Sequence, residues 1–345
     1  MPSNILIVYT GGTIGMVHDK DTGSLVPFDF GKIEDRIPEL KSFSCAIDFI
    51  SYHPLIDSSD VTTTLWNQLA QTIYDNQINY GAIIILHGTD TMAYTASALS
   101  FMLEGKHVPV LLTGSQLPIG AVRTDARNNL ITTVEIACQL IQKNIALNEV
   151  CICFDDLLLR GNRCEKFTSS RFYAFRSENF PALADAGTEI EFHPELFLAI
   201  PTQSLRIQPL LHIPVWLIKI HPSMNLEFMM ACLNAQNNAS LPKAILLETF
   251  GAGNAPTDKR FEEFVSDAIA KNMVVVNVSQ CIGGAVEPGK YAGSYRLHQL
   301  GVINGHDLTT EAALAKLMYL FSKGLESKQV ALQMEISLRG EMDLR

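Results

Sequence analysis

Residues 4–15 read NILIVYTGGTIG, an unbroken apolar run that ends in a turn rich in glycine and threonine. The pattern returns at residues 81–91, which read GAIIILHGTDT. Glycine lets the main chain approach a ligand closely and adopt conformations that a side chain forbids. Each turn therefore presents a threonine hydroxyl beside main-chain N–H groups, and the second turn adds the carboxylate of Asp90. Hydroxyls, a carboxylate and donors for a developing oxyanion are the parts of an acyl-transfer site.

Strand-like and helical segments alternate through the first half of the chain. Apolar runs without polar interruption are typical of strands in a sheet that is covered on both faces. Between them, apolar residues recur at helical spacing, as at Leu65, Leu69 and Ile73. The alternation predicts an α/β fold with a parallel-rich sheet and helices on both faces. The expected strands are 4–9, 81–86, 108–112 and 150–154, and the expected helices are 61–80, 91–103 and 128–143.

The length of the chain favours two domains, since 345 residues exceed the usual size of a single core. Periodicity lapses at residues 191–214, where four prolines recur, and this segment is predicted to be a linker. Residues 1–190 then form a larger N-terminal catalytic domain, and residues 215–345 form a smaller C-terminal α/β domain. In the second domain the expected strands are 215–220, 244–247 and 273–277, and the expected helices are 226–237, 258–271, 309–322 and 327–338.

The composition argues against several classes of protein. The net charge is −10 and no basic run occurs, so nucleic acid is not an expected partner. No secretory signal or membrane-spanning run of roughly 20 residues is found, so a cytoplasmic protein without a membrane partner is expected. Seven scattered cysteines without CxxC spacing are expected to be reduced and buried. Since phosphate-loop, dinucleotide and metal-ligand motifs are also missing, neither an organic cofactor nor a metal is expected.

Polar clusters gather at one predicted edge of the first sheet, where ligands bind in open parallel folds. N–H groups at helix starts near Asp60 and Asp90 favour a carboxylate, and Asp57 or Asp90 favours an ammonium group. A free amino acid therefore fits this edge. The alternative is that Ser59 and Asp90 cap helices, which is the usual role of such residues. The clusters are residues 10–15, 57–60, 87–91 and 113–116.

A threonine hydroxyl is a weak nucleophile and needs a base or a cation nearby. Lys166 is the candidate, since it lies in a polar stretch soon after the strand predicted at 150–154 and a desolvated lysine can accept a proton. Judged from its residue type alone, Lys166 is more often a solvated surface lysine. Beside the second turn stands His87, where we expect a structural imidazole rather than a catalytic one.

These motifs resemble those of the bacterial-type L-asparaginase family, and specifically its cytoplasmic type I branch. Thr-Gly-Gly-Thr-Ile at residues 10–14 together with His-Gly-Thr-Asp-Thr at residues 87–91 is a highly specific combination, and the similarity extends over essentially the whole chain. The resemblance implies a larger N-terminal and a smaller C-terminal α/β domain. It also implies hydrolysis of L-asparagine to L-aspartate and ammonia, without a metal or an organic cofactor.

The resemblance further implies a role for each residue that matches the family motifs. Thr13 is the expected nucleophile of an acyl-enzyme mechanism, and Thr89, Asp90 and Lys166 are expected to relay protons or activate water. Family members form homodimers, often doubled to tetramers, so Asn254 is expected to contribute from a neighbouring subunit. The residues expected to bind the substrate are Asp57, Ser58, Ser59, Thr89, Asp90 and Ser115.

Two departures from the family pattern stand out. The family usually carries a tyrosine on the loop after the first motif, whereas residues 22–27 contain none, so that Ser24 or a residue from elsewhere must replace it. Members that asparagine activates carry an arginine where this chain has Glu248, and Glu165 replaces a small hydroxyl residue beside Lys166. Since a carboxylate repels the carboxylate of such an effector, we expect hyperbolic kinetics, although Asn254 and Cys281 match the regulated members.

Two alternatives to an asparaginase stay open. The asparaginase-like subunit of the archaeal-type tRNA-dependent amidotransferase carries a further N-terminal domain, whereas nine residues precede Thr10. A non-catalytic amino-acid sensor would use the same pocket, but it has no need of two threonine hydroxyls and a lysine. Within the enzyme class, asparagine and glutamine differ by one methylene, which a pocket discriminates by only about 1 to 3 kcal/mol.

Overall fold

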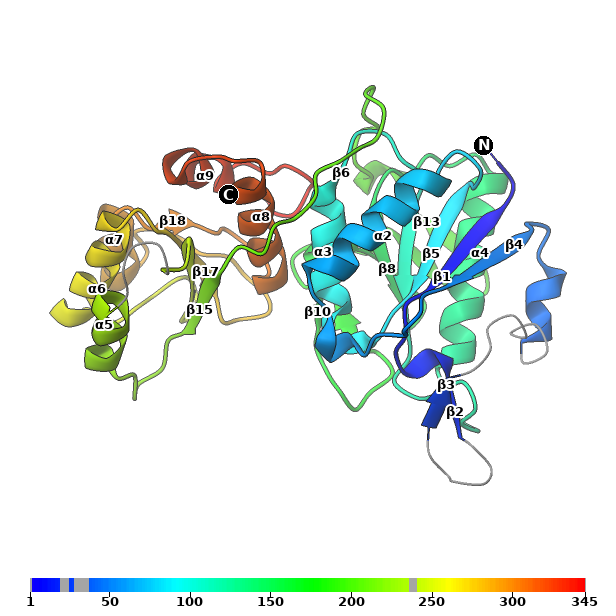
Figure 1. Ribbon diagram of the computed structural model, residues 1–345, viewed down its shortest axis with the longest axis horizontal. Helices are drawn as coiled ribbons and strands as arrows, with labels where there is room; N and C mark the ends of the chain where they lie inside the picture. The colour runs from blue at the N-terminus through cyan, green and yellow to red at the C-terminus, as the bar shows by residue number, and fades with distance from the viewer. Residues whose placement is uncertain (1, 19–24, 28–36, 236–240, 345) are drawn as a thin grey trace. The chain divides into compact units, whose positions relative to one another are not determined.

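The computed structural model describes residues 2–18, 25–27, 37–235 and 241–344. The chain forms two compact units, Met1–Ile207 and Gln208–Arg345 (Figure 1). Each unit holds a sheet with helices packed against it, which confirms the predicted α/β class.

An eight-stranded mixed sheet forms the centre of the first unit, in the order β13-β12-β9-β8-β7-β5-β1-β4. The five strands from β8 to β4 run parallel. Every residue of β1, β5 and β8 is buried, which explains why these strands are apolar throughout. The parallel strands are β1 (Ile5–Tyr9), β4 (Ile47–Ser51), β5 (Ala82–Leu86), β7 (Val110–Thr113) and β8 (Val150–Phe154).

Antiparallel strands extend the sheet beyond β8. A tight turn through Asp155 and Asp156, whose φ angles are 47° and 65°, joins β8 to β9. Aspartate tolerates this left-handed conformation better than most residues. The sequence patterns do not predict these strands or β4, since they are short or only half-buried. The antiparallel strands are β9 (Leu157–Arg160), β12 (Ala184–Ala186) and β13 (Ile190–Phe192).

Helices cover both faces of this sheet. Leu130 and Val134 on α4 (Ala126–Gln142) pack with alternate residues of β1 and β5. The helices α2 (Thr63–Asn76) and α3 (Met92–Met102) contact one another, and Figure 1 shows them on the other side of the sheet from α4.

The starts of α2 and α3 differ from the sequence expectation. The N-cap of α2 is Thr62 rather than Ser59 or Asp60. Asp57 instead caps a separate 3-10 turn, Ser58–Asp60, which extended Val61 separates from the helix. Likewise α3 starts two residues after Asp90, because Thr89–Thr91 forms a 3-10 turn of its own. These residues are thereby held at the sheet edge instead of inside helices.

The segment 191–214, predicted to be a linker, contains the boundary between the two units. Part of it adds structure to the first unit, since β14 (Arg206–Ile207) pairs with β6 (Leu103–Glu104). Residues 208–214 carry neither helix nor strand.

The second unit contains a four-stranded parallel sheet in the order β15-β16-β17-β18. Amphipathic α6 buries Phe261, Phe264 and Val265 in its core. The sequence patterns do not predict α7 and β18, which are short and carry few apolar residues. The strands are β15 (Val215–Lys219), β16 (Ala244–Thr249), β17 (Val274–Ser279) and β18 (Ile303–Asn304), and the helices are α5 (Leu226–Ala235), α6 (Lys259–Ala270), α7 (Ala292–Gln299), α8 (Thr310–Ser322) and α9 (Ser327–Met334).

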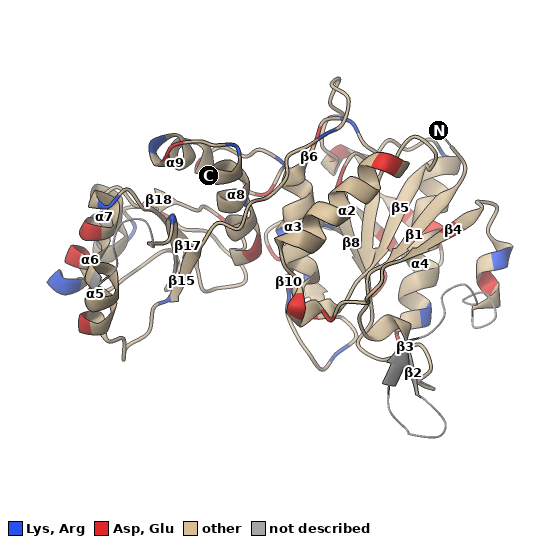
Figure 2. Ribbon diagram, viewed as in Figure 1, with Lys and Arg blue, Asp and Glu red and all other residues tan. Residues whose placement is uncertain are grey.

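Charged residues of both signs are spread over each unit, and Figure 2 shows no continuous basic stretch on a described element. None of the described helices combines the length and the apolar character that crossing a membrane requires. All seven cysteines are free, and five of them are buried. Cys281 is exposed, which corrects the expectation of burial for that residue, since it lies in the loop after β17.

Candidate active site

Three neighbouring strands end level with one another at one edge of the first sheet. In the parallel register Tyr9 pairs with Leu86, and Leu86 pairs with Thr113. Thr10 donates to the Leu86 carbonyl from its N–H at 3.1 Å and from its hydroxyl at 3.0 Å. The His87 N–H donates to the Thr113 carbonyl at 2.9 Å. The polar turns that follow these strands are therefore brought together.

The two glycine-rich turns touch each other. A methyl group on Gly12 would lie 2.5 Å from Cα of Gly88, and Gly12 has a φ of 86°, so this position requires glycine. Thr13 and Thr89 each follow one of these glycines. Thr13 is half-buried and opens the 3-10 turn Thr13–Gly15. The chain continues into β2 (Met16–His18), which pairs with β3 (Leu25–Pro27), while Ser24 lies outside the described residues.

The turn at residues 57–60 packs against the second glycine turn. Ser58 is buried, its carbonyl accepts a 2.7 Å hydrogen bond from the Thr91 hydroxyl, and its Oγ would lie 2.5 Å from a methyl group on Gly88. The N–H and the hydroxyl of Ser59 both donate to Asp57 Oδ1 at 2.9 Å. These two hydrogen bonds lower the pKa of Asp57 and keep its carboxylate charged.

Lys166 reaches the second turn from a different part of the chain. It lies on β10 (Glu165–Lys166), which pairs with β11 (Phe175–Arg176). Its Nζ donates to Thr89 Oγ1 at 2.7 Å and to Asp90 Oδ1 at 2.6 Å. The Lys166 side chain is 17% exposed, whereas that of Asp90 is 64% exposed. Lys166 is therefore not a solvated surface lysine, and it joins a hydroxyl and a carboxylate in one group.

His87 has the structural role expected of it. Its Nδ1–H donates to the Gly88 carbonyl at 2.7 Å, so Nε2 is the acceptor of the 3.0 Å hydrogen bond with the Thr95 hydroxyl. The same hydroxyl accepts from Trp66 Nε1 at 2.9 Å. Burial lowers the pKa of His87 to about 4, so the ring is neutral. This chain of bonds fixes the carbonyl that precedes Thr89.

Gln116 lies beside Thr89, a contact that the sequence patterns do not reveal. Its Oε1 is 3.5 Å from the Thr89 hydroxyl, and its Nε2 donates to the carbonyls of Thr168 at 3.2 Å and Arg171 at 3.0 Å. The position of Gln116, three residues after the end of β7, is the one signal that points to it. The neighbouring hydroxyl, Ser115 Oγ, donates to the Leu117 carbonyl at 2.6 Å, so its hydrogen is used within the turn.

Two further residues named in the sequence analysis belong to the second unit. Asn254 closes a tight turn, since its N–H donates to the Phe250 carbonyl at 2.8 Å. The Glu248 carboxylate accepts from the Thr310 hydroxyl at 2.7 Å and lies 3.6 Å from Lys219 Nζ. Glu248 is thus a partly buried, hydrogen-bonded anion.

The chain matches two family models, that of the N-terminal asparaginase domain over residues 4–197 and that of the glutaminase/asparaginase C-terminal domain over residues 214–334. It belongs to the asparaginase family. L-asparaginase 1 of Escherichia coli is 37% identical to it over 98% of both chains. The crystal structure of L-asparaginase I from Vibrio cholerae matches all of both chains with a TM-score of 0.87 and 38% identity. A glutamyl-tRNA(Gln) amidotransferase subunit of Methanosphaera stadtmanae is 33% identical over 99% of this chain and 77% of that protein.

Proposed function

We propose that this protein is an amidohydrolase that converts L-asparagine to L-aspartate and ammonia. The main support is the group of Lys166, Thr89 and Asp90, which is joined by hydrogen bonds of 2.7 and 2.6 Å on a turn that touches the Thr13 turn. Membership of the asparaginase family and the 37% identity with L-asparaginase 1 of E. coli support the same reaction.

Thr13 is the proposed nucleophile. Its Oγ1 attacks the carbon of the side-chain amide, and main-chain N–H groups of the glycine-rich turns stabilise the oxyanion. The C–N bond then breaks, the nitrogen takes a proton and leaves as ammonia, and an aspartyl ester on Thr13 is left. A water molecule attacks this ester, Thr13 regains its proton, and L-aspartate leaves.

Lys166 and Thr89 are proposed to move the protons of both steps. The 2.7 Å hydrogen bond between Nζ and the Thr89 hydroxyl is short enough for direct proton transfer. Asp90 holds the lysine at this place and balances its charge when it is protonated. Gln116 Oε1 provides an acceptor for the Thr89 hydrogen while the lysine donates to that hydroxyl.

The amino-acid part of the substrate is proposed to bind at residues 57–59, Asp90 and Ser115. Asp57 carries the charge that the α-ammonium group needs, since Ser59 keeps its pKa low. Ser58 packs against Gly88 and accepts a hydrogen bond from Thr91, so this turn is held against the second glycine turn.

We further propose a homodimer or a dimer of dimers that acts in the cytoplasm, with Asn254 reaching the site of a neighbouring subunit. Residues 1–190 would then be the catalytic domain, 191–214 the linker and 215–345 the domain that supplies Asn254. The mixed charges of the surface do not favour nucleic acid as a partner.

A subunit of a tRNA-dependent amidotransferase is the second candidate, supported by the 33% identity with the protein of Methanosphaera stadtmanae. We place it second because L-asparaginase 1 is 37% identical and matched over 98% of its length.

Ammonia release by the purified protein without tRNA tests the proposal. L-asparagine, L-glutamine and D-asparagine are compared at equal concentrations, and the rate is followed over a wide range of L-asparagine. We expect L-asparagine to react fastest. We also expect its rate to rise hyperbolically with concentration, because Glu248 is a bound anion where an effector carboxylate would sit. Ammonia release that requires tRNA would favour the amidotransferase, and a lack of release under all conditions would favour the sensor.

A further inference from the structure

A cavity of about 540 Å³ lies in the first unit at the edge of the sheet opposite the candidate active site. Pro109, directly before β7, lines this cavity, whereas the turn after β7 carries Ser115 and Gln116. The two sites are therefore at opposite ends of one four-residue strand. The volume of the cavity lies within the range of small-molecule sites.

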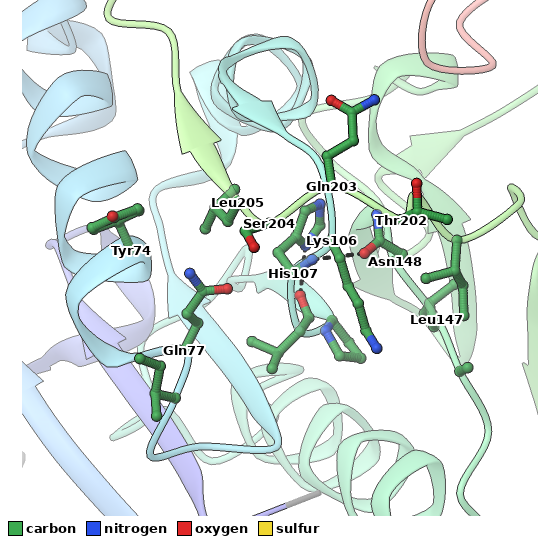
Figure 3. Close-up of a pocket in the computed structure, with 15 residues that line it drawn as sticks. Tyr74, Gln77, Lys106, His107, Leu147, Asn148, Thr202, Gln203, Ser204 and Leu205 are labelled. Carbon is green, nitrogen blue, oxygen red and sulfur yellow. Dashed lines mark hydrogen bonds between the residues drawn. The ribbon is translucent and has the colours of Figure 1, made fainter.

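Apolar and polar side chains both line the cavity (Figure 3). Leu147 and Leu205 are buried and lie on different sides of the cavity. Gln77, at the end of α2, and Ser204, in the segment before β14, face one another on one side of the cavity, and the Lys106 side chain extends along the side where Leu147 lies. Within the described part of the chain, the side chains of these three polar residues have no hydrogen-bond partner in the protein, so they are available to a ligand.

The charges on the cavity wall favour an anion. The chain carries a net charge of −10, yet none of the fifteen described residues that line this cavity is Asp or Glu. Lys106 contributes a positive charge at the rim. A carboxylate on an apolar body would pair with Lys106, while the body lies against the apolar lining.

The turn that carries Lys106 is held rigidly, so the cavity is formed before a ligand binds. The Lys106 N–H donates to the Gln203 carbonyl at 2.8 Å, and a methyl group on Gly105 would lie 2.5 Å from the Ser204 carbonyl oxygen. Asn148 Oδ1 accepts from the His107 N–H at 2.7 Å, and its Nδ2 donates to the Gly105 carbonyl at 3.3 Å. A preformed site loses less free energy on ordering when a ligand binds.

We propose that this cavity is a second ligand site, separate from the catalytic one, that binds a small organic carboxylate with an aromatic or branched apolar body. Recognition depends on the charge of Lys106 and on the apolar part of the lining, and it does not depend on the asparaginase proposal.

Isothermal titration calorimetry with 2-naphthylacetate tests this site, and 2-(2-naphthyl)ethanol serves as the uncharged probe of the same shape. We expect one carboxylate to bind per chain, with the alcohol at least about tenfold weaker. Lys106→Met should weaken naphthylacetate by about tenfold and leave the alcohol unchanged, whereas Lys328→Met, an exposed lysine of the second unit, should change neither. Saturating L-aspartate should not compete.

Gln77→Trp fills the cavity with a large side chain and should abolish binding of both probes, with its thermal unfolding midpoint measured to check folding. If that variant fails to fold, the effect of Lys106→Met on naphthylacetate binding decides whether the proposal stands, and an unchanged affinity overturns it. The proposal is overturned if neither probe binds, if the alcohol binds as tightly as the carboxylate, or if L-aspartate displaces the carboxylate.

Discussion

The burial and the hydrogen-bond partners of Lys166 cannot be predicted from its residue type alone. A lysine in a polar stretch is usually solvated, and the spacing of the chain does not reveal that its partners Thr89 and Asp90 lie 77 and 76 residues earlier. The resemblance to the asparaginase family predicts that Lys166 relays protons, and the hydrogen bonds show how Lys166 is placed against Thr89 and Asp90. His87, by contrast, is predictable from its place after an apolar strand, because an imidazole there is buried with the strand end.

We predict that Lys166→Met lowers kcat for L-asparagine by at least about 100-fold, because methionine keeps the length of the side chain but cannot transfer a proton. Steady-state ammonia release measures the effect, and Lys143→Met, at the C-cap of α4, is the matched control with an expected rate near that of the unaltered protein. A variant that keeps more than about a tenth of kcat, a barrier change below roughly 1.4 kcal/mol, would return Lys166 to a structural role.

The pKa of His87 predicts part of the acid sensitivity of the fold. The ring has a pKa of about 4 in the folded protein and about 6.5 when unfolded, so between these values the unfolded state binds the additional proton. The free energy of unfolding should therefore fall by roughly 3 kcal/mol from this residue as the pH drops from 6.5 to 4. Urea titrations of the protein and of His87→Asn across this range measure the difference. Parallel pH dependence in the two proteins would contradict the assignment.

At the level of elements, the fully buried strands are predictable from the sequence, and the short or half-exposed strands are not. β1, β5, β7 and β8 are read from apolar runs because both faces of each are covered. Strands such as β4 and β12 are short or half-exposed, and their pairing partners, rather than their own residues, determine that they are strands. The same holds for the site, since its turns are predictable but the contacts of Gln116 and Lys166 depend on the fold.

Gly12→Ala should disturb the contact between the two glycine-rich turns. The added methyl group meets the Gly88 main chain at 2.5 Å, and alanine is strained at a φ of 86°, so the turn and Thr13 must shift. We expect kcat to fall at least about tenfold, measured by ammonia release, with a lower thermal unfolding midpoint. Gly187→Ala, whose nearest neighbour would be 3.8 Å away, is the control and should change neither. Full activity of Gly12→Ala would show that the turn can adapt.

At the level of the whole molecule, the chain forms two units, and the second holds the C-terminal residues in place. Lys316 and Glu341 form a fully buried ion pair at 2.7 Å. Glu341 also accepts from the N–H groups of Leu338 and Arg339. These residues lie beyond the end of α9 at Met334, so the helix predicted at 327–338 is four residues shorter than expected. Burial lowers the pKa of Lys316, so this lysine depends on its partner to stay charged.

Removing one partner of this pair should destabilise the second unit. We predict that Glu341→Gln lowers the free energy of unfolding by about 3 to 5 kcal/mol, because the Lys316 charge is then buried without its counterion. The double variant with Lys316→Met should recover most of this loss, as chemical denaturation would reveal. A double variant no more stable than Glu341→Gln would mean that the pair matters through packing instead.

The proposed covalent chemistry at Thr13 is tested most directly by trapping its ester. Thr89→Val protein is mixed with L-asparagine, quenched in acid within milliseconds to seconds, and digested for mass spectrometry. Thr89 is proposed to act in both steps, and we expect its loss to slow the attack of water more than the attack of Thr13, because the water must also be held in place. We therefore predict that this variant accumulates an aspartyl ester on the peptide that contains Thr13, and that Thr13→Ala/Thr89→Val forms none. An ester on another residue, or unmodified Thr13 while the same sample releases ammonia, would contradict a threonine nucleophile at this position.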